Sequence, residues 1–321
     1  MQDPEGNPAC FSPHDRLTDD PAAATKSGQS VVMSVYQTKI TGQCRSVTVT
    51  WCKSLLVHGL SISVQGSDNQ SSCKVELKPW SFWRKQGSKR FYIDGKPVDV
   101  FWDLKAVKFG REPEPQSDYY VAVVCEEEVV LLLGDLKKEA YRKTGSRPAL
   151  IDASLVLRKE HIFGKKRFST RAKFHEKGKN HGILIECSNN NTKRSNCGSS
   201  NSWESIEPEM VIRIDGHLAI HVKHLQWKFR GNESISIDKF RVEVYWDVHD
   251  WLFIPGLQHA LFVFKPMSSS PSLPLSSSSL SSSMTPDTLS SSQTACSSLI
   301  DANSVGGPQG FCLYLYAWML E

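Results

Sequence analysis

A short hairpin signature occurs twice in this chain and restricts its possible folds more than any other feature. Ile93-Asp94-Gly95 recurs as Ile214-Asp215-Gly216, and an apolar strand segment follows each copy. A two-residue hairpin turn needs positive φ at both central positions, which Asp tolerates and Gly adopts freely. The repeat therefore predicts two antiparallel β units of similar construction.

Further matches between the two halves occur in the same order and at a nearly constant separation. They pair His58-Gly59 with His181-Gly182, Leu104 to Phe109 with Leu225 to Phe229, and Asp118 with Asp238. Unrelated β domains can share turn fragments of this kind, but the common order and spacing favour an internal duplication.

The strand pattern within the units is that of antiparallel sheets. Residues 46–51 and 60–64 alternate apolar and polar side chains with period two, which predicts one buried and one solvated face. Residues 119–124 and 129–133 are unbroken apolar runs and predict central strands buried on both faces. Residues 135–144 are rich in helix formers and predict one short helix.

These signals divide the 321 residues into five parts. We expect a disordered leader (1–30), a first β unit (31–147), a second β unit (148–266), a Ser-rich disordered loop (267–309) and a terminal strand (310–321) that returns to the second unit. The leader and the Ser-rich tract lack the apolar residues that a core requires. The predicted fold class is all-β, with two tandem, internally duplicated antiparallel units, each a sandwich or an up-and-down barrel.

The bulk composition excludes several classes of protein. The formal net charge of +4 comes from 38 basic and 34 acidic residues, a balance too even to predict nucleic-acid or anionic-lipid partners. The first residues lack the pattern of a secretory signal, and no apolar run approaches the roughly 18 residues of a membrane span. The nine cysteines form no C-x-x-C pair, which argues against a disulfide or zinc framework. We predict a soluble intracellular protein, cytoplasmic or nuclear and not secreted.

Several stretches together resemble a plant family known only as domain of unknown function 868. The stretches are LKPWSFWRKQGSKRF (Leu77–Phe91), VDVFWDLKAVKFG (Val98–Gly110), SDYYVAVV (Ser117–Val124), EEVVLLLGDLKKEAYRKT (Glu127–Thr144), HIFGKKRFSTRA (His161–Ala172), HLQWKFRGNE (His224–Glu233), VYWDVHDWLF (Val244–Phe253) and FCLYLYAW (Phe311–Trp318). The resemblance covers nearly everything from Val31 to Lys265. It implies a plant protein and brings no assigned activity, cofactor or catalytic residue.

One segment interleaves aromatic and basic side chains and is the leading candidate for a binding surface. Its candidate residues are Trp80, Phe82, Trp83, Arg84, Lys85, Lys89 and Arg90. Stacking aromatics beside cations suit single-stranded nucleic acid, and Trp with Lys or Arg suits a membrane interface. The plainer interpretation is a loop whose Trp side chains cap the open end of a sandwich while its charges face water.

Two groups of polar residues could carry chemistry. Asp247 and His249 lie two apart, so on a strand they would share a face and the carboxylate could orient the imidazole. No nucleophile accompanies them, and a structural hydrogen bond is the simpler interpretation. Of the nearby histidines, only His217 and His221 would share a face, which is too few ligands for a metal site. We therefore predict no metal.

The sequence carries no phosphate loop, dinucleotide fingerprint or complete catalytic set. The leading prediction is a non-enzymatic binding or interaction protein without a cofactor, and the pattern leaves open a protein partner or a small apolar ligand. One alternative is an enzyme or enzyme remnant that uses Asp247 and His249. A further alternative is contact with a lipid surface or RNA through the loop from Trp80 to Arg90.

Overall fold

The computed structural model describes residues 30–54, 57–66, 70–77, 85–164, 166–175, 178–189, 207–238, 240–256, 258–267 and 310–319. The leader expected over residues 1–30 lies outside this range except for Ser30. Nearly all of the Ser-rich tract expected over residues 267–309 also lies outside it.

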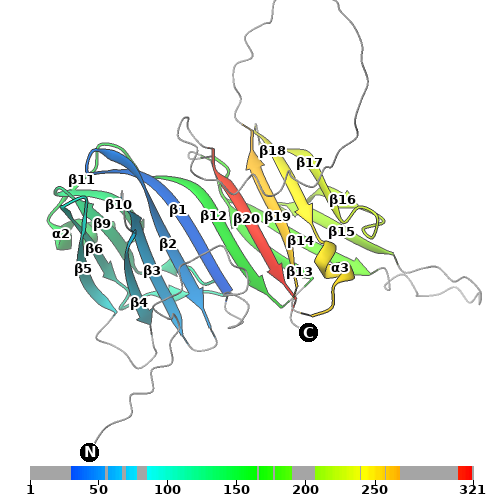
Figure 1. Ribbon diagram of the computed structural model, residues 1–321, viewed down its shortest axis with the longest axis horizontal. Helices are drawn as coiled ribbons and strands as arrows, with labels where there is room; N and C mark the ends of the chain where they lie inside the picture. Colours follow the sequence, from blue (N-terminus) through cyan, green and yellow to red (C-terminus); the bar gives the residue numbers. More distant parts are fainter. Residues whose placement is uncertain are drawn as a thin grey trace, which may run out of the picture.

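A nine-stranded sheet crosses the whole molecule, with smaller sheets at its two ends (Figure 1). Its strands, in spatial order, are β17 (Arg230–Ile237), β18 (Phe240–Asp247), β19 (His259–Pro266), β20 (Cys312–Trp318), β12 (Ser154–Phe163), β1 (Ser30–Ile40), β2 (Gln43–Lys53), β3 (His58–Gln65) and β4 (Gln70–Leu77). Neighbouring strands are antiparallel except β12 and β20, which are parallel.

Two smaller sheets complete the layers. The five-stranded sheet runs β11 (Arg147–Pro148), β10 (Glu128–Gly134), β9 (Tyr120–Cys125), β6 (Lys96–Asp103) and β5 (Gln86–Ile93). The four-stranded sheet runs β13 (Arg167–Ala172), β14 (His181–Asn189), β15 (Pro208–Ile214) and β16 (His217–Val222). A small two-stranded sheet joins β7 (Lys108–Phe109) and β8 (Pro115–Ser117).

The two larger hydrophobic cores of the described residues lie on one face of the nine-stranded sheet, which we call its inner face. One core joins β2 and β3 to the five-stranded sheet, and the other joins β18, β19 and β20 to the four-stranded sheet. The register shows that the face is shared, because Trp51 lies opposite Val32, Val32 opposite Glu160, and Glu160 opposite Leu315. Residues paired across strands project from the same face.

A buried ion pair occupies the inner face between the two cores. On β12, Nε of Arg158 lies 2.5 Å from Oε1 of Glu160, and a second guanidinium nitrogen lies 2.7 Å from Glu114. Burial raises the pKa of Glu160, and the adjacent Arg158 opposes that rise. Removing one partner of such a pair would leave the other charge buried and unpaired. The resulting loss of stability is far larger than the net stabilisation that the intact pair provides.

The two Asp-Gly hairpins form as the sequence predicts. Asp94 and Gly95 have φ of 50° and 78° between β5 and β6, and Asp215 and Gly216 have φ of 50° and 83° between β15 and β16. These left-handed conformations are those of a two-residue hairpin turn.

Two short helices accompany the sheets. The predicted helix is present as α2 (Lys137–Thr144), and its Ala140 packs against Ala122 and Val124 on the outer side of β9. Strand β9 is thereby buried on both faces, as its unbroken apolar run predicts. The second helix, α3 (His249–Phe253), was not predicted. No helix in the described part of the chain is long and apolar enough to span a bilayer.

The all-β prediction is confirmed, and the described strands form open sandwiches rather than a closed barrel. The halves are joined edge to edge, because β1 of the first half pairs with β12 of the second. The terminal strand β20 lies between β12 and β19. The domain boundaries and the internal duplication stay predictions.

Candidate functional site

The predicted aromatic and basic loop falls only partly within the described residues. Trp80, Phe82, Trp83 and Arg84 lie outside them. Lys85 is half-buried, and its carbonyl oxygen accepts the backbone N–H of Leu104 at 2.6 Å. Lys89 and Arg90 are exposed on β5. The Arg90 guanidinium donates two hydrogen bonds, of 2.7 and 2.8 Å, to Asp99. Its charge is therefore paired within the five-stranded sheet.

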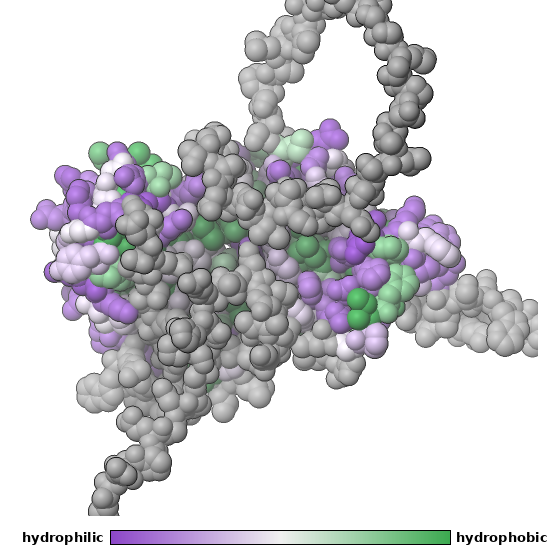
Figure 2. Space-filling model, in the orientation of Figure 1, coloured by the Kyte–Doolittle hydropathy of each residue, from purple (hydrophilic) through white to green (hydrophobic). Residues whose placement is uncertain are grey.

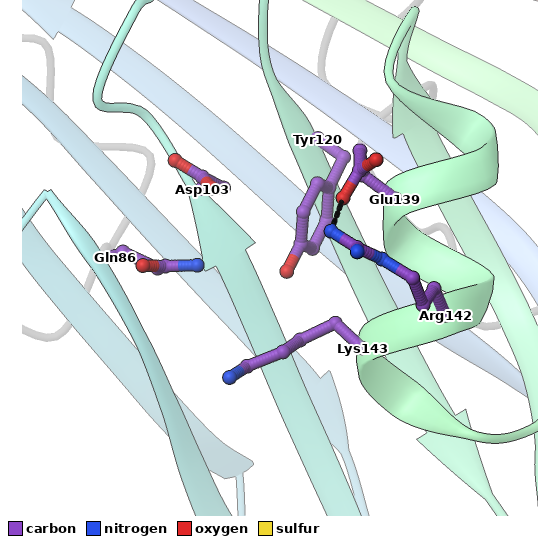
Figure 3. Close-up of a pocket in the computed structure, with 6 residues that line it drawn as sticks. All are labelled: Gln86, Asp103, Tyr120, Glu139, Arg142 and Lys143. Atoms are coloured by element: carbon purple, nitrogen blue, oxygen red, sulfur yellow. Dashed lines mark hydrogen bonds and ion pairs between the residues drawn. The ribbon is translucent and has the colours of Figure 1, made fainter.

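A polar pocket of about 310 Å³ lies between α2 and the strands β5, β6 and β9. It is lined by Gln86, Asp103, Tyr120, Glu139, Arg142 and Lys143. Figure 3 shows Lys143 reaching from α2 toward the strands, and Arg142 paired with Glu139 beside the Tyr120 ring. Burial, followed by the charges of Asp103 and Glu139, raises the pKa of Tyr120. The Tyr120 hydroxyl is thus a protonated donor, and the lining suits a polar group rather than an apolar ligand.

The structure does not join the side chains of Asp247 and His249. Asp247 ends β18, where one carboxylate oxygen accepts the backbone N–H of His249 at 3.1 Å and the other accepts Nε–H of Arg230 at 2.7 Å. His249 begins α3 rather than continuing the strand, and its Nδ1 lies 3.0 Å from Asp250. Asp250, rather than Asp247, therefore faces the imidazole. A catalytic role for either residue stays a prediction.

The histidines of the β16 region are spread over separate partners. His217 is exposed, Nε2 of His221 lies 3.0 Å from Glu209, and His224 pairs with Glu207. Among the described residues no group of three or more His, Cys, Asp or Glu side chains is placed to hold a metal ion.

A buried histidine that the sequence marked only as part of the internal repeat bridges two hairpin turns. His181 is 4% exposed. Its Nδ1 lies 2.9 Å from Asp215 and its Nε2 lies 3.2 Å from Asp238. Carboxylates only accept hydrogen bonds, so the ring satisfies both when both nitrogens carry hydrogen. The backbone N–H of Gly182 and then the His181 ring lower the pKa of Asp215. The arrangement ties β14 to both turns and is structural.

The outer face of the nine-stranded sheet carries an unexpected group of rings, which we call the aromatic face. Its members project from β12, β20 and β19 and are His161, Phe163, Tyr314, Tyr316, Trp318 and His259. Leu313, Leu315 and Ala317 alternate with the β20 rings and are buried in the second core. Because side chains alternate across a strand, the rings project from the opposite face.

The rings of the aromatic face stack from strand to strand. Trp318 lies 5.9 Å from Phe163 on one side and 4.5 Å from His259 on the other, measured between ring centroids. Tyr316 stacks on His161 at 4.7 Å with an interplanar angle of 8°. Trp318 is buried, whereas the other five rings are half-buried. Stacking occupies ring faces and leaves ring edges, with their polar atoms, to meet solvent or a partner.

Polar and charged groups border the aromatic face. Lys159 on β12 places Nζ 6.0 Å from the Tyr314 ring centroid. The Tyr245 hydroxyl donates to Glu243 at 2.6 Å, and that carboxylate, together with burial, raises the pKa of Tyr245. Burial lowers the pKa of His259, which favours its neutral form. Exposed Arg241 and Lys265 lie on neighbouring strands at the same end as Lys159, so this border is basic.

The sequence contained part of the signal for this face. Residues 312–318 are apolar or aromatic at every position, which predicts a buried strand. The pattern does not show which face of that strand packs in the core. The alternation of Tyr314, Tyr316 and Trp318 with smaller residues marks them as one face. Pairing with β12, distant in sequence, places His161 and Phe163 beside them.

Comparisons with known proteins give one match. The family model described as plant protein of unknown function (DUF868) matches residues 27–319. No curated protein and no solved structure matches the chain.

Proposed function

This chain belongs to the DUF868 family of plant proteins of unknown function, and we propose that it is a non-enzymatic interaction protein that binds a protein partner on its aromatic face. The family membership confirms the resemblance seen in the sequence, while the role of the face is inferred from its chemistry. Cytosol or nucleus is the proposed location.

The observation that carries the proposal is the ring stack on the outward side of the sheet. An antiparallel sheet that packs on one face usually presents polar side chains on the other. Here Trp318 and five half-buried rings share this face over three adjacent strands, and the rings of His161, Phe163 and His259 contact Trp318 directly. Tyr, Trp and Phe are enriched in protein interfaces, because they combine a large apolar area with few rotatable bonds.

The border of the face indicates the chemistry of the partner. Lys159, Arg241 and Lys265 give one end of the face a positive charge that Glu243 only partly offsets. Complementary charge around an interface increases the association rate and helps fix orientation. We therefore expect a partner surface that brings apolar groups to the rings and carboxylates to this basic end.

A protein partner fits better than the small apolar ligand that the sequence left open. Apolar ligands bind in concave, mostly apolar cavities that remove them from water. The pocket beside α2 is lined by polar and charged side chains. The rings instead lie across three neighbouring strands of an open sheet, which suits them to contact with another protein surface.

The experiment places a photo-crosslinking amino acid at Tyr316 in the full chain, expressed in plant cells, and at Tyr92 as a matched control. Tyr92 is 65% exposed on β5, which belongs to the five-stranded sheet rather than to the sheet that carries the aromatic face. The partner crosslinked at Tyr316 is then purified, and its affinity is measured by calorimetry for wild type, Tyr316→Ser and Tyr92→Ser. We expect Tyr316→Ser to weaken binding about tenfold or more, and Tyr92→Ser to have no effect.

Two outcomes would overturn the proposal. One is an absence of crosslinked protein at Tyr316 above the level seen at Tyr92. The other is an equal affinity of Tyr316→Ser and wild type for the purified partner. Tyr316→Phe keeps the ring stack and serves as the folding control, because it should retain binding.

A further inference from the structure

The floor of the polar pocket beside α2 is a row of three polar residues on three neighbouring strands. Gln86 on β5 lies opposite Asp103 on β6, and Asp103 lies opposite Tyr120 on β9. Residues paired in this way project from the same face of a sheet, and here it is the outer face, on which α2 packs. We call this space of about 310 Å³ the Tyr120 pocket. Its volume is at the lower end of the range of about 300–1,000 Å³ that small-molecule sites occupy.

The Tyr120 hydroxyl enters the pocket without a partner from the protein. Tyr120 is 1% exposed, and its ring packs with Ala122 and Ala140. Its hydroxyl forms no hydrogen bond with another described residue, and Figure 3 shows it directed toward the space between Gln86 and Lys143. The hydroxyl of a buried tyrosine usually has a hydrogen-bond partner. A ligand atom that accepts a hydrogen bond would supply the missing partner.

The charges that line the pocket sum to zero, and one charge of each sign is unpaired. The lining contains the carboxylates of Asp103 and Glu139 and the cations of Arg142 and Lys143. Glu139 and Arg142 pair with each other on α2. Asp103 and Lys143 form no ion pair with any described residue. The pocket therefore offers one carboxylate and one ammonium group to a ligand.

The two unpaired charges come from different elements. Asp103 ends β6, and its Oδ1 accepts the backbone N–H of Lys105 at 3.1 Å. This bond orients the carboxylate and leaves its other oxygen for a ligand. Figure 3 shows Asp103 and Lys143 on either side of the Gln86 side chain. A ligand in the pocket would thus meet opposite charges at two separate places.

From these features we propose that the Tyr120 pocket binds a free α-amino acid through both of its charged groups. Lys143 and the Tyr120 hydroxyl donate to the ligand carboxylate, and Asp103 accepts from the ligand ammonium group. An anion without an ammonium group would leave Asp103 unpaired and meet its repulsion. A cation without a carboxylate would meet Lys143 in the same way. The neutral lining therefore favours a zwitterion over an ion of one sign.

The position of the pocket agrees with a ligand that arrives from water. Figure 2 shows mainly hydrophilic side chains at the end of the molecule that carries α2. The pocket opens on the five-stranded sheet, whereas the aromatic face belongs to the nine-stranded sheet. Binding of an amino acid and binding of a protein partner can therefore be measured separately.

The test is a saturation-transfer NMR titration of the purified full chain with L-alanine, L-serine, L-glutamine and L-leucine. We expect at least one of them to bind with a Kd of about 1 mM or lower. The controls are the deaminated and the decarboxylated analogue of each amino acid, which are propionate and ethylamine for alanine. Each analogue should bind at least about tenfold more weakly, because a charge-assisted hydrogen bond is lost.

Three variants locate the binding in the pocket. Tyr120→Phe should weaken amino-acid binding about tenfold, and it should keep the wild-type melting temperature because the hydroxyl has no partner in the protein to lose. Lys143→Ala should weaken binding about fivefold, since this lysine is exposed. Lys138→Ala is the matched control, because it removes an exposed lysine from the same helix outside the lining. It should bind like wild type.

The inference fails on any of three results. The first is that none of the four amino acids binds at concentrations up to about 10 mM. The second is that the deaminated analogue binds as tightly as its amino acid, which would make the pocket a site for anions. The third is that Tyr120→Phe and Lys143→Ala bind as tightly as Lys138→Ala, which would place the amino acid elsewhere on the chain.

Discussion

Trp318 donates its indole N–H to Nδ1 of His161 at 3.3 Å, across the parallel pair that joins β20 to β12. An indole nitrogen can only donate, so Nδ1 of His161 must be unprotonated in this arrangement. On its other edge β12 pairs with β1 of the first half. The proposed partner-binding face therefore lies beside the junction of the two halves, and its rings stabilise that junction as well as forming a surface.

The hydrogen bond and the ring stack of Trp318 can be separated by substitution. Trp318→Phe removes the N–H donor and keeps a ring between Phe163 and His259, so we expect the free energy of unfolding to fall by about 1 kcal/mol. Trp318→Ala also removes the buried ring and should cost roughly 3–5 kcal/mol. Urea unfolding measures both changes. Equal losses for the two variants would show that the stack contributes little.

Stability should decrease as the pH falls below neutrality. Burial lowers the pKa of His259 in the folded protein, and burial with nearby Lys53 lowers that of His58. The unfolded chain, where histidine titrates near 6.5, then binds more protons than the folded chain at mildly acid pH. Stability is full above that value and is lost as the pH falls through it toward the folded pKa.

The histidine origin of this pH effect can be checked with matched variants. Melting temperatures measured between pH 7.5 and pH 5 should fall less steeply for His259→Phe than for wild type. His217→Phe, at an exposed position on β16, should keep the wild-type slope. Identical slopes for all three proteins would assign the effect to other groups.

Elements that depend on the residues of their own segment could be predicted from the sequence. The φ preferences of Asp94 and Gly95 were sufficient to predict the hairpin, and the apolar run of β9 was sufficient to predict burial on both faces. The helix α3 was missed because its five residues are too short to show helical periodicity. There the Asp247 carboxylate accepts the His249 N–H and so favours a turn where the pattern suggested a strand.

The aromatic face could not be predicted because it depends on pairing between distant strands. Period-two alternation shows which residues of a strand share a face, but it does not identify the neighbouring strand. His161 and Tyr316 meet only because β20 enters between β12 and β19. The same limit applies to His181, whose two carboxylate partners come from different hairpin turns.

His181 should contribute more to stability than its neighbour Lys179. His181→Ala removes a buried ring together with its contacts to Asp215 and Asp238, which we expect to cost about 2–4 kcal/mol. Lys179→Ala should cost less than about 0.5 kcal/mol, because its ammonium group lies 3.7 Å from each carboxylate at an exposed position. Chemical unfolding of both variants measures the two losses in the free energy of unfolding. Similar losses would mean that the bridge is not a significant constraint.

The edge strand β17 should be sensitive to a single methyl group at Gly231. A Cβ at Gly231 would lie 2.4 Å from Cζ2 of Trp246, the residue opposite it on β18. The Trp246 ring cannot move freely, because its Nε1–H donates to the Lys228 carbonyl at 3.0 Å and its side chain packs in the second core. Gly231→Ala should therefore lower the free energy of unfolding by about 1–3 kcal/mol.

Gly182 provides the matched control for this substitution. It lies within β14, and a Cβ there would meet its nearest atom, Oδ1 of Asp215, at 3.8 Å, an ordinary contact. Gly182→Ala should be neutral or slightly stabilising, because alanine restricts the unfolded chain. The two variants are compared by urea unfolding and by the tryptophan fluorescence of the folded state. If Gly231→Ala were as stable as Gly182→Ala, β17 would have to shift away from Trp246 at little cost, and the close approach of the two strands would not be a constraint on the fold.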